Sequence, residues 1–129
     1  MMLAFLFLTA SAELQALDHA VARCDRDEVS PIFSAESARR SQNLLDAYTE
    51  QEKIVAARLA LAERQRALRE TDTKASAEEE RAIRLEQALL DDRQRALNDQ
   101  RMLEGIRQQT IDAMRRHYLS HCPSGKARN

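Results

Sequence analysis

Tryptophan is absent from this sequence of 129 residues, which also has only two glycines and two prolines. Folds rich in sheets and tight turns need more of both, and the aromatic residues that favour strands make up only 4% of the chain. Alanine, leucine, arginine, glutamate and glutamine dominate instead, and all of these have high helix propensity. The composition therefore predicts an all-α fold in one small domain.

The sequence also lacks an excess of charge of either sign. It has 20 basic and 21 acidic residues, which are mixed along the chain and give a net charge of -1. Nucleic-acid binding requires a concentrated positive field, and no segment supplies one. We therefore expect no nucleic-acid partner.

Motifs for catalysis are missing as well. The chain has no glycine-rich phosphate loop, no G-x-S-x-G elbow and no H-E-x-x-H pair. The adjacent Asp91 and Asp92 and the run from Glu78 to Glu80 are interpreted as a solvated helix face and a first turn matched to the helix dipole. We expect no enzyme, no cofactor and no small-molecule substrate.

The longest apolar run lies at the start of the sequence, from Leu3 to Leu8. It is far shorter than the ~20 residues that span a bilayer, so we expect no stable membrane insertion. The run is followed by Ala10-Ser11-Ala12, which fits the small-x-small site of a signal peptidase. Residues 1–12 are therefore predicted to be a signal peptide, with the protein secreted or periplasmic after cleavage near Ala12. The alternative is the buried first turn of a cytosolic protein.

Residues 13–29 are predicted to form a short helix and a linker. Apolar residues recur there at spacings of three and four, which places them on one face: Leu14, Leu17, Val21 and Cys24. Ser30 then supplies a candidate N-cap, with Pro31 at the first helical position. A long helix is expected over about residues 31–70.

The two expected long helices share a heptad pattern. Ser76 and Glu79 form a candidate capping box for the second helix, over about residues 77–121. Residues 123–129 are predicted to be a disordered tail, because Pro123 and Gly125 end the helix. The heptad columns contain Phe33, Ala47, Ile54, Leu61 and Leu68 in the first helix, and Ile83, Leu90, Leu97, Ile111 and Tyr118 in the second, where Glu104 interrupts the column.

A turn near Thr73 would pair the two helices as a coiled-coil-like antiparallel hairpin over residues 30–122. Residues whose numbers add up to about 147 then lie opposite one another, because both helices rise equally per residue. This register pairs Leu45 with Met102 and Phe33 with Met114. It also places Cys24 beside Cys122, so we predict that a disulfide closes the open end of the hairpin in an oxidising compartment.

A metal site is the alternative interpretation of the same end. His117 and His121 are four residues apart on one helical face, and Cys122 and Cys24 complete a ligand set suited to zinc or copper. Oxidised cysteines bind metal poorly, so the two interpretations compete. The disulfide is preferred, and no metal is expected.

Apolar residues beside the first heptad column span more than one stripe's width. They are Leu44, Leu45, Tyr48, Val55 and Leu59. We expect Leu45, Tyr48, Val55 and Leu59 to form an interaction surface for a protein partner or for self-association. The sequence thus predicts a non-catalytic exported structural or interaction module. A holdase-type chaperone for envelope proteins is the second hypothesis, since long charged hairpins resemble the tentacled periplasmic holdases in outline.

Overall fold

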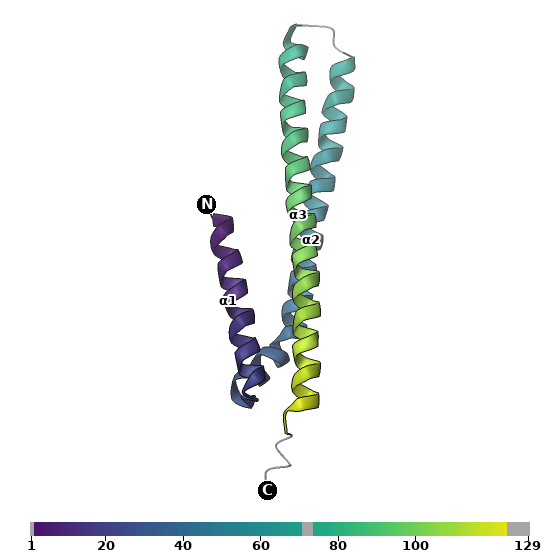
Figure 1. Ribbon diagram of the computed structural model, residues 1–129. Helices are drawn as coiled ribbons and strands as arrows, with labels where there is room; N and C mark the ends of the chain where they lie inside the picture. The colour runs from purple at the N-terminus through teal and green to yellow at the C-terminus, as the bar shows by residue number, and fades with distance from the viewer. Residues whose placement is uncertain (1, 71–73, 124–129) are drawn as a thin grey trace. The chain divides into compact units, whose positions relative to one another are not determined.

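Three α-helices and no strand make up the part of the chain that the computed structural model describes, residues 2–70 and 74–123. The side chains of residues 2–11 and 74–76 lie outside this description, as do the predicted turn at 71–73 and the tail from 124. The helices are α1 (Met2–Ala22), α2 (Arg26–Arg69) and α3 (Lys74–His121) (Figure 1). The predicted all-α fold is confirmed: α2 and α3 pair as an antiparallel hairpin, with α1 as the additional N-terminal helix.

The chain divides into two compact units. The first contains Met1–Ser41 and Glu104–Asn129, and therefore includes α1, the start of α2 and the end of α3. The second, Gln42–Leu103, contains the rest of α2 and α3. Each unit has its own buried cluster.

The seam of the second unit follows the predicted heptad columns. Ile54 is fully buried, and Leu61 packs with Ile83 and Leu90 in one cluster. Leu97 is buried too. Fully burying one such side chain stabilises a fold by about 1.5–3 kcal/mol, so this apolar column contributes to holding the two helices together here.

The first unit has a core built from all three helices. It combines Leu17, Ala20 and Val21 of α1 with Val29 of α2 and Ile111 of α3, each at most 3% exposed. Partly buried residues pack around this cluster, namely Leu14, Ile32, Phe33, Met114 and Tyr118. Phe33 and Met114, which the predicted register pairs, both pack against this cluster, and the ring of Phe33 lies 6.0 Å from that of Tyr118. The spacing of Leu14, Leu17 and Val21 therefore did mark the buried face of α1.

The connection between α1 and α2 is tighter than predicted. The N–H of Asp25 bonds to the carbonyl of Ala20, and the N–H of Cys24 to that of Val21, which is the Schellman arrangement at a helix end. Cys24 occupies the left-handed position with φ 55°, where glycine is usual. Figure 1 shows α1 ending where α2 begins.

The predicted start of α2 at Ser30 and Pro31 is wrong. Asp25 caps the helix one turn earlier, where its carboxylate Oδ1 lies 3.3 Å from the N–H of Glu28 and its carbonyl accepts from Val29. Pro31 therefore lies inside α2. Its missing N–H costs a single bond near the start of the helix, and the cap at Asp25 offsets this loss.

Two further expectations need correction. α3 begins at Lys74 rather than near residue 77, so Ser76 lies within its first turn, and the carboxylate of Glu79 accepts a hydrogen bond from Arg64. Leu45 and Met102 do not meet in the seam, since they are 57% and 62% exposed. Matching register alone does not bury a side chain, because the side chain must also point toward the partner helix.

Candidate functional site

The disulfide between Cys24 and Cys122 joins the turn after α1 to the end of α3. Its Cα atoms lie 5.5 Å apart and its S–S length is 2.02 Å, which confirms the predicted pair. The N–H of Cys122 bonds to the carbonyl of Tyr118, so the helical pattern carries the chain up to the bridge. The two cysteines are separated by 98 positions in the sequence, so the bond closes a long loop of the chain.

The four-residue metal alternative is not assembled. Cys24 and Cys122 are bonded to each other, so neither offers a thiolate. Across residues 2–70 and 74–123 no group of three or more histidine, cysteine or acidic residues is placed to hold a metal ion. His117 and His121 nevertheless lie side by side, with ring centroids 4.1 Å apart and planes inclined by 23°.

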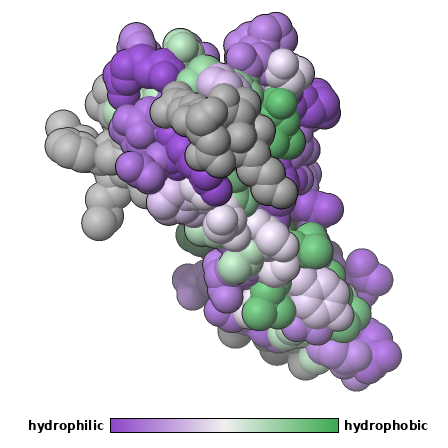
Figure 2. All heavy atoms as spheres, turned by 90° about the horizontal axis from the view of Figure 1, so that it is seen from below, coloured by the Kyte–Doolittle hydropathy of each residue, from purple (hydrophilic) through white to green (hydrophobic). Residues whose placement is uncertain are grey.

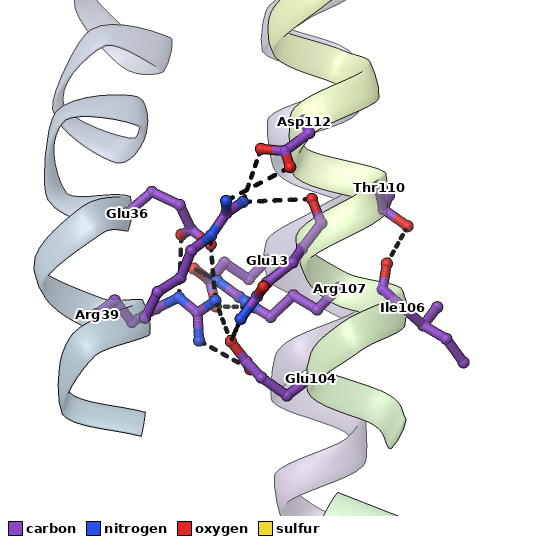
Figure 3. Close-up of polar contacts among 10 residues, drawn as sticks. Glu13, Glu36, Arg39, Glu104, Ile106, Arg107, Thr110 and Asp112 are labelled. Atoms are coloured by element: carbon purple, nitrogen blue, oxygen red, sulfur yellow. Dashed lines mark hydrogen bonds and ion pairs between the residues drawn. The ribbon is translucent and has the colours of Figure 1, made fainter. Parts of the chain in front are cut away.

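A charged cluster connects α2 to α3 in the first unit (Figure 3). Arg39 donates to both carboxylate oxygens of Glu104, at 3.0 and 2.7 Å, and also to both oxygens of Glu36. Arg40 donates to Glu36 at 2.9 Å and to Asp112 at 2.8 Å. Glu36 is only 7% exposed, so its charge is held away from water by two guanidinium groups.

Electrostatics keep this cluster ionised. Burial by itself would raise the pKa of Glu36, but hydrogen bonds from Arg39 and Arg40 outweigh it and lower that pKa. Burial opposes ionisation of Glu104 in the same way, and hydrogen bonds from Arg39 and Gln108 lower its pKa. The pKa of Arg39 is raised by its bonds to Glu36 and Glu104. The cluster is thus a set of ionised, mutually paired side chains that links α2 to α3.

An ion pair fastens α1 to α3. Arg107 donates to the two carboxylate oxygens of Glu13, at 3.0 and 3.3 Å. The side chain of Arg107 is 14% exposed, whereas that of Glu13 is 52% exposed. Glu13 is the residue that would follow the predicted cleavage site, so cleavage would preserve this contact. Within the described residues no helix is long and apolar enough to cross a membrane.

Polar contacts cross the hairpin in the second unit. Gln51 and Gln94 donate to each other at 2.9 Å, and Arg93 donates to Glu50 at 2.7 Å. Arg64 near the end of α2 donates to Glu79 and Glu86 of α3. These contacts use polar residues that break the apolar pattern. The signal that could have revealed them is that complementary polar residues lie within about one helical turn of each other in the predicted register.

The predicted interaction surface is exposed to solvent. Leu45, Tyr48, Val55 and Leu59 are 57%, 62%, 47% and 65% exposed, and Leu44, on the same helix, is 67% exposed. At about 100° per residue, Leu44, Tyr48, Val55 and Leu59 form one stripe on α2. This α2 stripe lies roughly a third of a turn from the buried Ile54 and Leu61, with Leu45 at its edge. The sequence had therefore located exposed apolar surface that the hairpin itself does not cover.

A second group of exposed apolar residues lies on α3. Leu85 and Leu89 are 64% and 54% exposed, and Leu103 is 42% exposed. Leu89 borders a shallow depression shared by both helices, whose lining residues are Ala57, Leu61, Glu86, Leu89, Leu90 and Arg93. Figure 2 shows one face of the molecule, on which hydrophobic residues reach the surface between hydrophilic ones.

Comparisons with protein-family models, curated proteins and solved structures found no match for this chain.

Proposed function

We propose that this protein is an exported, non-catalytic structural module that acts by binding other protein surfaces along its helices. The observation that carries the proposal is the α2 stripe, which exposes Leu44, Tyr48, Val55 and Leu59 while a separate column fills the hairpin seam. Contiguous apolar surface beyond what a small monomer needs marks an interaction site.

The occupant proposed for the α2 stripe is a second copy of the same chain. Leu44 and Leu59 are equidistant from the peptide bond between Gln51 and Glu52, and Tyr48 and Val55 are equidistant from it too. A two-fold axis at this point would place Leu44 against the partner's Leu59 and Tyr48 against the partner's Val55. Such reciprocal contacts are what a symmetric dimer requires.

The size of the stripe is consistent with a reversible dimer. Two facing stripes with their neighbouring side chains would bury on the order of 1,000 Å², near the lower limit for a specific interface. Glu52 is exposed and lies next to the proposed axis, where it would approach its own copy. Like charges in that position weaken association, so we expect an equilibrium between monomer and dimer.

Sedimentation velocity of the mature protein tests the proposal. Val55→Glu with Leu59→Glu should shift the protein to monomer, because it places charges in the apolar contact. Ala60→Glu with Ala67→Glu is the matched control, since it adds the same charge to exposed positions away from the stripe and should leave the dimer largely intact. Glu52→Gln should tighten the dimer several-fold by removing repulsion at the axis. A monomeric wild type at high micromolar concentration would contradict self-association.

Export is the second part of the proposal. Support comes from the apolar run before Ala12 and from the disulfide, since such bonds persist in oxidising compartments. Cleavage after Ala12 would also retain Glu13, Leu14 and Leu17, which hold α1 in the first unit. We therefore propose a periplasmic or secreted location.

A holdase for unfolded envelope proteins is the alternative function. It is supported by the exposed Leu85, Leu89 and Leu103 of α3, which a dimer formed along α2 would not cover. Light scattering during the aggregation of a reduced, unfolding client protein would separate the two functions. Suppression of scattering by the mature protein, lost on Leu85→Glu with Leu89→Glu, favours the holdase; no suppression favours the structural module.

A further inference from the structure

The last turn of α3 brings two imidazoles together outside the contacts described so far. His117 and His121 are both exposed, and their rings stack with centroids 4.1 Å apart. The i and i+4 spacing places both rings on one helix face, as in helical motifs where two histidines bind one metal ion. No part of the proposed dimer surface or of the charged cluster involves them.

Two oxygens lie within hydrogen-bond distance of one ring nitrogen of His121. Its Nδ1 lies 3.1 Å from the carbonyl oxygen of His117, which can only accept, and 2.8 Å from the hydroxyl of Ser120. That hydroxyl donates to the same carbonyl at 3.1 Å. In the tautomer in which Nδ1 donates to this carbonyl, the lone pair of Nε2 is free for a ligand. A metal-binding histidine typically donates its other ring N–H to a carbonyl in this way.

We propose that His117 and His121 together bind one divalent first-row transition-metal ion through their imidazole nitrogens. With metal–nitrogen bonds of about 2.0–2.1 Å, the two nitrogens would lie about 3 Å apart. Because the lone pair of an imidazole lies in the plane of its ring, the two rings must turn about their side-chain bonds out of the stacked arrangement until both lone pairs point at the ion. Water fills the remaining coordination positions, and the site takes metals that favour imidazole, such as Zn²⁺, Ni²⁺ and Cu²⁺.

Metal binding by the two histidines leaves the disulfide intact. Cys122 follows His121 directly and stays bonded to Cys24, so metal binding does not depend on reduction. The ion would hold the final turn of α3 in the helical conformation, next to the bridge that fixes its end.

Isothermal titration of the oxidised, tag-free protein with Zn²⁺ and with Ni²⁺ tests the proposal. We expect saturable binding of one ion per chain, and His117→Ala should lower the affinity at least tenfold. His19→Ala, which removes a histidine from α1, is the matched control and should leave binding unchanged. All these positions are exposed, and alanine preserves the helix.

A rescue variant separates a two-histidine chelate from loose binding to single histidines. Ala113→His with His121→Ala moves the pair one turn earlier at the same spacing, and it should restore binding of one ion. Binding that is unaffected by His117→Ala, or the absence of saturable binding in the wild type, would overturn the proposal. Binding that appears only after reduction would also overturn it, because the thiols would then be the ligands.

Discussion

Arg39 of α2 and Glu104 of α3 form two parallel hydrogen bonds, of 2.7 and 3.0 Å, across 65 residues of sequence. The side chain of Glu104 is 12% exposed, and it occupies a position where the heptad column calls for an apolar residue. A charge at such a position is stable only because a guanidinium group meets it in a bidentate geometry. This contact locks the register of the two helices in the first unit.

Removing one partner of this pair should cost more than removing both. Glu104→Leu should lower the free energy of unfolding by about 1–3 kcal/mol, because it leaves part of the Arg39 guanidinium without its acceptor. Arg39→Met together with Glu104→Leu, in a chain that also carries Glu36→Gln, should recover part of that loss, since an apolar pair can replace a buried ion pair and no charge is left at Glu36. Urea unfolding of this variant, of Glu104→Leu and of Glu36→Gln measures the difference.

Arg95 and Asp92 provide the matched control. Their side chains are 72% and 67% exposed, so Asp92→Asn should change the unfolding free energy by less than about 0.5 kcal/mol. Equal effects of the two carboxylate substitutions would show that the Arg39 contact is no more than a surface ion pair.

Acid should weaken the fold through the same cluster. The pKa values of Glu36 and Glu104 are lowered in the folded chain from 4.5. As the pH falls, these carboxylates therefore take up protons in the unfolded chain at a higher pH than in the folded chain. Their contribution is fully present above that pH and is lost as the pH falls through the lowered values. The slope is at most about 1.4 kcal/mol per pH unit for each carboxylate. Denaturant unfolding between about pH 6 and pH 3 should show a flatter profile for Glu36→Gln with Glu104→Gln; an unchanged slope would contradict this assignment.

Loss of the disulfide should destabilise the protein by about 2–4 kcal/mol, because the bond restricts the unfolded chain over a long loop. Guanidinium unfolding with and without dithiothreitol measures the difference. Cys24→Ser with Cys122→Ser should match the reduced wild type and should not respond to the reductant. If reduction leaves the unfolding midpoint unchanged, the bond has no stabilising role.

Much of the fold could be predicted from the sequence because helix signals are local and repeat. The column from Ile54 to Leu61 and the column from Ile83 to Leu97 follow the heptad spacing, and both are buried. The equal rise of the two helices was enough to pair Cys24 with Cys122. Both predictions, the buried columns and the cysteine pair, rest only on the periodicity of the sequence and on helix geometry.

The polar contacts were not predicted, since periodicity treats polar residues in a seam only as interruptions. Glu104 breaks the column, and only the folded hairpin brings Arg39 to meet it. The start of α2 was missed for a related reason. Pro31 is a strong local signal for a helix start. However, the Schellman turn at Cys24 places Asp25 where it caps the N-terminus of α2, five residues before Ser30.

Export predicts a defined N-terminus. Protein recovered from the periplasm or medium should begin at Glu13, because Ala10-Ser11-Ala12 fits the peptidase site. Intact-mass spectrometry of the purified protein and of its reduced form checks both the cleavage and the disulfide. Ala12→Pro should block processing and is the control for the site. Soluble cytosolic protein that keeps Met1 would refute export.

Photocrosslinking at Tyr48 tests the interaction surface most directly. Tyr48→p-benzoylphenylalanine keeps an aromatic residue at the centre of the α2 stripe and leaves the hairpin seam untouched, because Tyr48 is 62% exposed. Irradiation should give a covalent dimer whose crosslinked peptide contains Val55 of the second copy, whereas the same label at Ala60, away from the stripe, should give little. A crosslink to a different protein, or no crosslink at Tyr48, would contradict self-association along α2.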